Sequence, residues 1–575
     1  DEIVAGEYCR QKIGPGGLFI GDGLQMAQAP YGVMWHKNEA YGAIRYINIF
    51  FEKIGNVYNM EDSEKKLWTA ELKALKAHFY FELMRRYGPI ILVPENIDPN
   101  ASLDEMKQPR RPIDEVVNAI VELCDEAIED LPYLKEKPST RITYHSKESA
   151  ATLKAMTLLY AASPLFNGNK MFANFLNKNG ERLFPDYDKE KWRKAAEAAD
   201  EAIKICEAAG KTLVTGNTDR PTKLLNIMKD IEDSALAPDY KNSEAIFYVR
   251  NTSGGPCGYI LPFFAGEGEG ADCYDPHSIG CLGASMKMVE MFYTEHGVPI
   301  SEDKQWVVAK YSMGRESDEK YTNVLNLNTE ILGLHRRREP RFYANIGADR
   351  TLWYRMQKSG SEQKYVAQEI CAYQGELYGT KITRIDNNTP QNLSGYWIKK
   401  YLRSNITFYY YTSRDNTEKG GIIFRLPDLY LASSEAWNEY LDAPDNRVYD
   451  PLNKIRERAG ILNVQEAWKN YARNPDKVNT KLGMREIIQQ EWNIEFAFEG
   501  RRFWNLRRWM TAPEELNTPQ YGWNVLGSTA ETFYHNYDGP IVVWSKRKFN
   551  VPRDYFFPIQ SEEVLMSECK QNLGW

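Results

Sequence analysis

The sequence contains no long apolar run and no excess of positive charge. No stretch of 18 apolar residues occurs, which excludes a membrane-spanning helix, because such a helix needs roughly 20 of them. The net charge is −7, so electrostatics do not favour nucleic acid as a partner. The one basic run, residues 335–338, is followed at once by Glu339, which indicates a solvated or ion-paired face.

The compact motifs of common enzymes are also missing. There is no GxSxG elbow and no HExxH sequence, and the seven histidines are widely scattered. A glycine-rich loop is present, but Gly266, Gly268 and Gly270 alternate with Glu267 and Glu269, whose carboxylates would repel a phosphate. The sequence therefore predicts no cofactor, although a carboxylate-based catalytic site would need no such motif.

The eight cysteines include no CxxC pair, and in a chain of 575 residues they do not indicate a disulfide framework. Cys257, Cys273 and Cys281 lie in one loop together with His277, which raises the question of zinc. A proline and a glycine between them disrupt the helix that would bring these ligands together. Free or packed side chains are the favoured interpretation, a disulfide comes next and zinc last, so no metal site is predicted.

Amphipathic helices are what the chain does contain. Residues 63–87 carry large apolar side chains every three or four positions, and Gly88 and Pro89 end the pattern. This spacing predicts one buried helical face made of Trp68, Leu72, Leu75, Phe79 and Leu83. Comparable patterns predict helices at residues 113–131, 147–162, 189–209, 424–441, 448–459 and 491–510. Paired helices with short breaks predict a mainly α fold built on a tetratricopeptide-like scaffold.

Residues 211–420 differ from the flanking helical segments. They are rich in glycine, asparagine, threonine and tyrosine, and they show few long apolar periods. We expect a single domain over residues 1–575, with this loop-rich insertion packed on one side of the scaffold. The scaffold would comprise approximately residues 35–210 and 420–510, followed by a C-terminal tail, residues 511–575.

The stretch EWNIEFAFEGRRFWNLRRWM, residues 491–510, contains a dense group of charges. Glu491, Glu495 and Glu499 recur every four residues and would form one stripe on a helix. Four arginines follow, at positions where cations suit both a helix C-terminus and those carboxylates. Paired catalytic carboxylates usually come from separate elements, so this stripe is interpreted as a structural network of ion pairs.

Nine segments, taken in order, resemble the SusD/RagB family of nutrient-binding surface lipoproteins. The matching segments are WHKNEAYGAIRYIN from residue 35, AELKALKAHFYFELMRRYGPIILVPE from 70, LLYAASPLFNGN from 158, ASMKMVEMFYTEHGVPI from 284, RREPRFYANI from 337, FRLPDLYLASSEAWNEY from 424, PLNKIRERAG from 451, the stretch 491–510, and FFPIQSEEVLMSECKQNLGW at the end. The sequence departs from the family pattern at Glu339, Asn505 and Leu573, and it lacks the N-terminal cysteine that bears the lipid.

The resemblance implies binding of a nutrient without catalysis. A member of this family would be a surface-exposed lipoprotein of the outer membrane, attached through a lipid anchor that this sequence lacks. It would hold a poly- or oligosaccharide and deliver it to a SusC-like TonB-dependent transporter, closing over the barrel like a lid. Two alternatives stay open: binding of peptides or another nutrient by the same mechanism, and a glycoside hydrolase using loop carboxylates.

The ligand-binding residues are predicted from chemistry, because the family's binding loops vary. A glycan site needs aromatic faces surrounded by carboxylates, amides or guanidinium groups. Three segments offer such groups. We expect substitution of Trp353 by alanine to weaken binding with little effect on stability. The candidates are Tyr31 in the N-terminal loop, Tyr259, Phe263, Phe264, Tyr274 and Asp275 in the glycine-rich loop, and Trp353, Tyr354 and Arg355.

Overall fold

The structure is a computed structural model that describes residues 1–14, 16–236, 242–250, 280–306, 308–359, 362–380, 382–385, 391–402 and 420–575. This part of the chain is mainly helical, which confirms the predicted fold class. Among these residues, no helix combines the length and the apolar character that a bilayer crossing requires.

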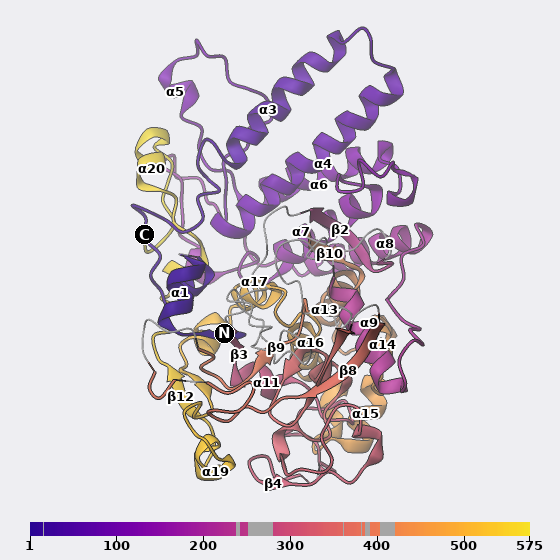
Figure 1. Ribbon diagram of the computed structural model, residues 1–575. Helices are drawn as coiled ribbons and strands as arrows, with labels where there is room; N and C mark the ends of the chain where they lie inside the picture. The colour runs from indigo at the N-terminus through magenta and orange to yellow at the C-terminus, as the bar shows by residue number, and fades with distance from the viewer. Residues whose placement is uncertain are drawn as a thin grey trace.

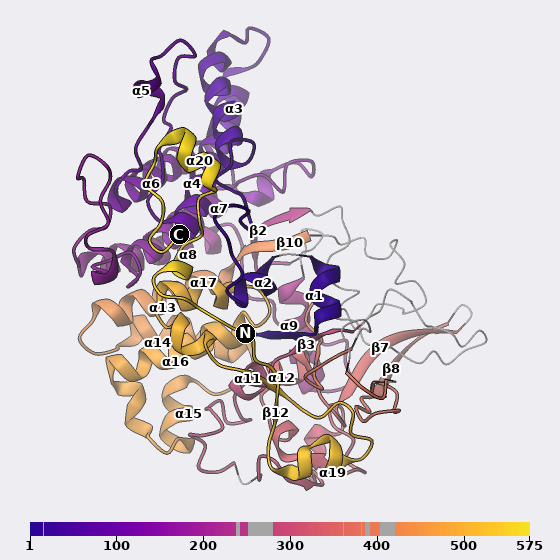
Figure 2. The same ribbon diagram turned by 90° about the vertical axis from the view of Figure 1, so that its left-hand side faces the viewer.

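A succession of packed helices forms a column along one side of the molecule (Figures 1 and 2). They are α3 (Ala40–Lys53), α4 (Asp62–Tyr87), α6 (Ile113–Asp130), α7 (Lys147–Ala162), α8 (Glu190–Ala208), α13 (Leu426–Tyr440), α14 (Asn446–Arg458), α15 (Val464–Tyr471), α16 (Lys481–Glu495) and α17 (Arg501–Arg508). Each packs on the next, α4 on α6, α6 on α7, α7 on α8, α8 on α13, and α13 on α14 and α16. This succession is consistent with tetratricopeptide-like pairs, whose repeat type stays a prediction.

Helix α4 is present as predicted, but it buries a different face. The fully buried positions include Ala70, Ala74 and Ala77, whereas Trp68 is 37% exposed. Leu72, Leu75 and Phe79 are only half-buried. The predicted face is therefore wrong at its first four positions and right at Leu83, which is fully buried. Small alanines allow α6 and α7 to approach the first half of α4 closely, while the large side chains there lie beside the contact.

The helix predicted over residues 491–510 is interrupted. Helix α16 ends at Glu495, and the chain turns through Phe498 and Gly500, whose φ angles are 65° and 76°. Helix α17 then starts at Arg501. A left-handed residue costs little at glycine, so Gly500 is a natural point for the break.

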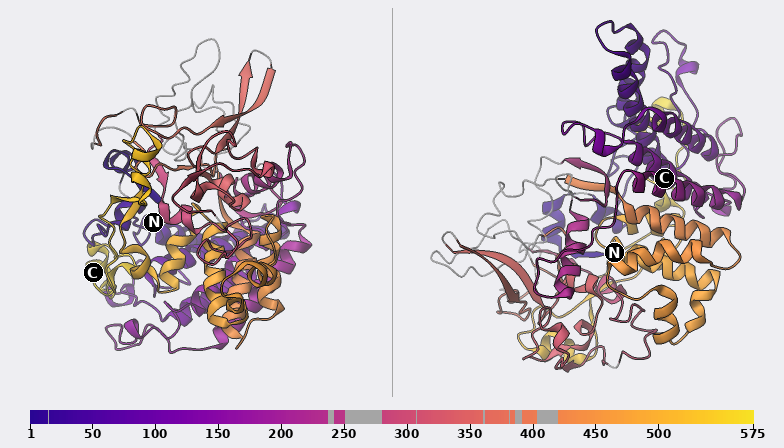
Figure 3. Two further views of the ribbon diagram at one scale, coloured as in Figure 1. Left: turned by 90° about the horizontal axis from the view of Figure 1, so that it is seen from below. Right: turned by 90° about the vertical axis from the view of Figure 1, so that its right-hand side faces the viewer.

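Strands and most of the remaining helices make up the other side of the molecule, shown in the right-hand view of Figure 3, whereas α5 and α20 lie beside the first helices in Figures 1 and 2. The remaining helices are α1 (Glu7–Ile13), α2 (Gly17–Gly21), α5 (Leu103–Met106), α9 (Lys223–Ala235), α11 (Met286–Met291), α12 (Pro340–Asn345), α18 (Ala512–Leu516), α19 (Ala530–Phe533) and α20 (Ser561–Ser567). The strands are β1 (Ile3–Ala5), β2 (Ala245–Arg250), β3 (Leu282–Ala284), β4 (Met313–Gly314), β5 (Ile331–Leu332), β6 (Ile346–Gly347), β7 (Leu352–Ser359), β8 (Glu362–Glu369), β9 (Trp397–Ile398), β10 (Gly420–Arg425), β11 (Gln520–Gly522) and β12 (Ile541–Trp544).

The strands pair antiparallel in small sheets. One sheet has the order β1-β3-β9-β6, with Ile3 opposite Ala284 and Gly347 opposite Trp397. The pairs β10–β2, β11–β12, β4–β5 and β7–β8 form two-stranded units. The β7–β8 hairpin projects from the body in Figure 2, and the sequence analysis did not predict it.

A disulfide ties the N-terminal segment to this side of the molecule. Cys9 of α1 is bonded to Cys281, which directly precedes β3. The bond connects residues 272 positions apart and lies beside the β1–β3 pairing. The favoured interpretation of Cys281 as a free or packed residue is therefore wrong, while Cys257 and Cys273 lie outside the described residues.

The C-terminal residues pack back on the N-terminal helices. The ring of Phe556 lies 5.3 Å from that of Phe172 and 5.8 Å from that of Phe184, between centroids. The Arg110 guanidinium donates to the carbonyl oxygen of Lys570 at 2.7 Å. The end of the chain thus completes the core of the first helices.

Ten buried charged residues form one cluster between the helical column and the strands, called the ion cluster below. Its cations come from α12, α14 and the ends of β9 and β10, and its carboxylates mostly from α16 and the turn after it. The members are Arg341, Lys400, Arg425, Arg456 and Arg458, and Glu244, Glu339, Glu491, Glu495 and Glu499. Five positive and five negative charges balance, and every side chain is at most 6% exposed.

The three glutamates of the predicted stripe all belong to this cluster, which supports their structural interpretation. Glu491 lies 2.5 Å from Arg341, Glu495 lies 2.6 Å from Arg425, and Arg425 also pairs with Glu499 at 2.8 Å. Burial opposes ionisation of Glu495, but Arg458, Arg425 and Arg341 hold its pKa well below the usual range.

The arginines that follow the stripe in sequence have other partners, contrary to expectation. Arg501 pairs with Asp428 at 2.8 Å, Arg502 with Asp1 at 2.8 Å, and Arg508 with Glu435 at 2.5 Å. Arg507 donates to backbone oxygens. The break at Gly500 redirects α17, so its arginines point away from the carboxylates of α16.

We predict that Arg425→Met lowers the free energy of unfolding by about 3–5 kcal/mol, because it leaves three buried carboxylates without their shared cation. Urea denaturation followed by circular dichroism measures the change. Arg447→Met is the matched control, since it removes an exposed pair with Asp445 and should change stability little. A comparable, small loss in both variants would contradict a structural role for the cluster.

A second buried network contains His335 as a neutral imidazole. The Trp523 indole N–H donates to the Tyr396 hydroxyl at 2.8 Å, and this hydroxyl lies 2.9 Å from Nε2 of His335. Nδ1 of His335 lies 3.2 Å from the carbonyl oxygen of Asp349, so it carries the proton. Burial lowers the pKa of His335 to about 3, which the nearby Arg338 reinforces.

The stability that this neutral imidazole contributes is present above pH 6.5 and is lost as the pH falls toward the lowered pKa. We therefore expect the stability difference between wild type and His335→Asn to narrow by roughly 3 kcal/mol between pH 7 and pH 4. Asp349, whose pKa burial raises to about 6, titrates in both proteins and drops out of the difference. Urea denaturation across this pH range measures it, and a constant difference would refute the prediction.

Candidate functional site

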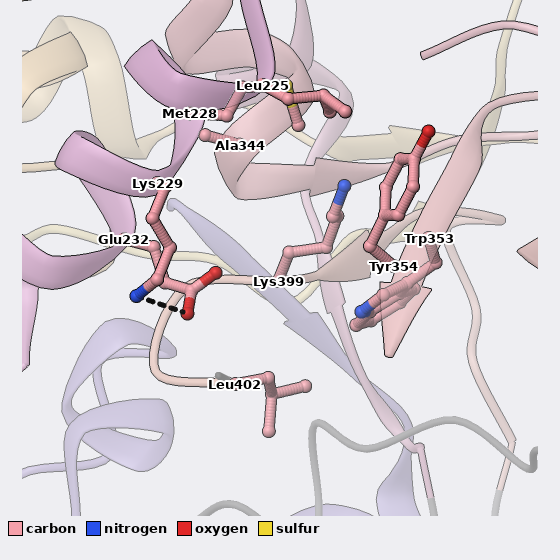
Figure 4. Close-up of a pocket in the computed structure, with 9 residues that line it drawn as sticks. All are labelled: Leu225, Met228, Lys229, Glu232, Ala344, Trp353, Tyr354, Lys399 and Leu402. Atoms are coloured by element: carbon pink, nitrogen blue, oxygen red, sulfur yellow. Dashed lines mark hydrogen bonds and ion pairs between the residues drawn. The ribbon is translucent and has the colours of Figure 1, made fainter. Parts of the chain in front are cut away.

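A narrow pocket lies between α9 and the start of β7. It encloses about 400 Å³ of empty space, part of it open to solvent. Figure 4 shows Lys229 and Glu232 on one side, Trp353 and Tyr354 on the other, and Lys399 between them. Its lining residues are Leu225, Met228, Lys229, Glu232, Ala344, Trp353, Tyr354, Lys399 and Leu402.

Helix α9 supplies the charged wall of the pocket. The Thr222 side chain accepts a hydrogen bond from the backbone N–H of Leu225 and caps the helix. Leu225 and Met228 face the protein interior, being 3% and 8% exposed. Lys229 and Glu232, three residues apart, form an ion pair of 3.4 Å at the pocket.

Strand β7 supplies the aromatic wall. Successive side chains of a strand leave on opposite faces, and the two rings differ accordingly. Trp353 is 3% exposed and stacks on Tyr378, with ring centroids 6.3 Å apart. Tyr354 is half-buried, and its hydroxyl lies 3.4 Å from Oδ1 of Asn323. Tyr354 is therefore the ring that a ligand can reach.

Lys399 places a buried amine between the two walls. Its Nζ donates to the carbonyl oxygen of Tyr343 at 2.6 Å and lies 5.7 Å from the centre of the Trp353 ring. Burial lowers the pKa of Lys399 to about 8, so its charge is weakly held at neutral pH. The pocket thus combines an aromatic ring, a buried donor and one carboxylate, groups that can hydrogen-bond hydroxyls.

The predicted site residues are only partly brought together. Trp353 and Tyr354 line this pocket, while Tyr31 lies elsewhere, in a loop where its backbone exchanges hydrogen bonds with Gln25. The side chain of Arg355 is not among those described. Tyr259, Phe263, Phe264, Tyr274 and Asp275 lie outside the described residues, so their roles stay predictions.

The sequence analysis missed the other lining residues because it did not predict α9. The buried residues Leu225, Met228 and Ile231 of α9 recur every three positions, but this helical signal stands in a segment that the sequence analysis assigned to loops. Lys399 carries no local signal, since it becomes part of the site only through the pairing of β9 with β6.

Comparison with known proteins identifies the family. The model of the SusD family matches residues 242–575, more than half of the chain. The chain belongs to the SusD family. SusD-like protein P25 of Formosa agariphila is 38% identical over 96 residues, which cover 17% of this chain and 16% of that protein.

Solved structures of SusD-like proteins share the fold along the whole chain. The structure of BT4246 superposes with a TM-score of 0.81 at 22% identity and covers 100% of this chain and 94% of that one. A SusD-like carbohydrate-binding protein of Bacteroides fragilis gives a TM-score of 0.62 at 18% identity, over 96% of this chain and 89% of that one. The SusD family fold therefore extends over the N-terminal helices, which the family model does not match.

The burial of Trp353 argues against the expectation that its substitution by alanine has little effect on stability. We predict that Trp353→Ala lowers the free energy of unfolding by about 3–5 kcal/mol, because it leaves a cavity in the core. Tyr354→Phe, which keeps the ring of the half-buried neighbour, is the control and should change stability by less than about 1 kcal/mol. Urea denaturation of both variants tests this, and an unchanged Trp353→Ala protein would show that the ring is dispensable for packing.

Proposed function

We propose that this SusD-family protein binds a poly- or oligosaccharide at the cell surface without cleaving it. The observation that carries the proposal is the pocket of Tyr354, Lys399 and Glu232 on a SusD-family fold. A half-buried ring offers a face for the C–H groups of a sugar, and the charged groups beside it can hydrogen-bond its hydroxyls.

The charges in the pocket favour binding over hydrolysis. Glycoside hydrolases use two carboxyl groups on either side of the scissile bond. Among the described lining residues Glu232 is the one carboxylate, and Lys229 pairs with it. A single carboxylate does not provide the pair that this mechanism requires.

The remaining parts of the proposal follow from the family. The protein would act at the outer membrane as a lipoprotein and deliver its ligand to a SusC-like TonB-dependent transporter. The B. fragilis structure described as carbohydrate-binding supports the ligand class by analogy of fold. Co-purification with a transporter from the native membrane would test the partner.

Affinity gel electrophoresis against plant, host and microbial polysaccharides tests the ligand class. Tyr354→Ala should weaken retention by about threefold to tenfold, the effect of losing one ring contact. Tyr46→Ala is the matched control, since Tyr46 is an exposed tyrosine on α3. Reducing-end release from the retained polysaccharide should stay at background.

If no polysaccharide is retained and peptides bind instead, the proposed ligand class is wrong. If reducing ends are released, the protein hydrolyses the polysaccharide, and the proposal of binding without cleavage is wrong. Unchanged retention of Tyr354→Ala would place the sugar elsewhere on the protein.

A further inference from the structure

A second, wider pocket opens on the side of α16 away from the ion cluster. It has about 1170 Å³ of empty space, including space open to solvent, and shares no lining residue with the first pocket. Its lining residues are Lys287, Glu290, Met291, Pro299, Ile300, Ser301, Lys310, Glu486, Gln489, Gln490, Asn493, Arg502 and Glu515.

The ion cluster decides which face of α16 reaches this pocket. Glu491 and Glu495 are held by buried arginines on one face. Gln489 and Asn493 are also four residues apart, but they are offset from the glutamates by two positions. On a helix with 3.6 residues per turn this offset corresponds to nearly opposite faces. The amides therefore line the pocket because the glutamates are fixed behind them.

The charges on the wall of this pocket are internally paired. Lys310 lies 2.5 Å from Glu290. Glu515 accepts hydrogen bonds from both Lys287, at 3.1 Å, and Arg502, at 2.7 Å. Glu486 pairs with Lys477 at 2.6 Å. The three lining cations and three lining carboxylates balance, so the wall selects neither an anion nor a cation.

One lining residue, Asn493, has an amide oxygen that no described residue satisfies. Asn493 is 7% exposed, and its Oδ1 has no hydrogen-bond partner among the described residues. Gln490, by contrast, donates to the carbonyl oxygen of Met291 at 2.8 Å and joins α16 to α11. A buried amide oxygen without a partner costs stability, so its retention here points to a ligand that supplies a donor.

We infer that this pocket is a second binding site for a neutral, hydroxyl-rich chain, of the length of a short oligosaccharide. The volume exceeds that of the first pocket, the wall is electrically balanced, and amides are suited to pair with hydroxyls. No aromatic residue is among the lining residues, so binding would depend on hydrogen bonds rather than ring stacking. The ligand class rests on the proposed function, while the location does not.

Hydrogen exchange measured by mass spectrometry can follow the two pockets separately. The probes are maltohexaose, cellohexaose, laminarihexaose and xylohexaose, each at millimolar concentration with the full chain. At least one should protect residues 286–301 and 481–495, which line the second pocket. Protection of residues 223–235 and 352–359 reports on the first.

The decisive variant is Asn493→Leu, which is close in size and removes the amide. Because the Oδ1 atom has no partner among the described residues, this variant should be as stable as wild type or more stable, so that loss of binding cannot be due to misfolding. We expect its affinity for the protecting hexaose, measured by calorimetry, to fall about threefold to tenfold. Leu482→Ala, an exposed position on the same helix, is the control.

The outcomes separate this inference from the proposed function. Protection of the first pocket alone, or unchanged affinity of Asn493→Leu, would overturn the second site and leave the proposed function standing. Protection of the second pocket alone would support the inference and remove Tyr354 from the binding site. Protection of neither by any hexaose would overturn both.

Discussion

The ion cluster joins parts of the chain that no continuous helix or sheet connects. Its charges come from segments as far apart as Glu244, Arg341, Arg425 and Glu499, and one arginine frequently serves several carboxylates. Removing charges from water is expensive, and the cost is recovered only when every partner is in place. The cluster therefore depends on all of these segments being in place, and it fixes how the helical column meets the strands.

Four of the segments that resemble the SusD family contribute to this cluster. RREPRF provides Arg341 and Glu339, FRLPD provides Arg425, PLNKIRERAG provides Arg456 and Arg458, and the stretch from residue 491 provides the glutamates. The departure at Glu339 keeps a carboxylate where the family pattern has aspartate, and Glu339 pairs with Arg341 at 2.7 Å. The family motifs in this part of the chain thus describe a structural centre, and both pockets are lined by residues outside it.

The sequence predicted the helices well and their partners poorly. Apolar spacing located α4, α6, α7, α8, α13 and α14 to within two residues at each end, because each is long and periodic. The same spacing misjudged the buried face of α4, since alanine packing depends on neighbours that periodicity does not reveal. The pairing of Cys9 with Cys281 and the choice of Arg425 over Arg501 as partner of the glutamates depend on contacts remote in sequence.

The candidate site shows the same limit of prediction from sequence at two adjacent residues, Trp353 and Tyr354. The sequence analysis proposed both Trp353 and Tyr354 as binding residues, but only strand β7 decides that one ring enters the core and the other stays half-buried. A buried tryptophan next to a half-buried tyrosine suits the proposed recognition of a sugar, because the first would hold the strand while the second would meet the ligand. Helix α16 follows the same principle: Glu491 and Glu495 fix one face, and Asn493, whose Oδ1 has no partner among the described residues, lies on the opposite face. In both places a buried, tightly held side chain positions the neighbour to which the two proposals assign ligand binding.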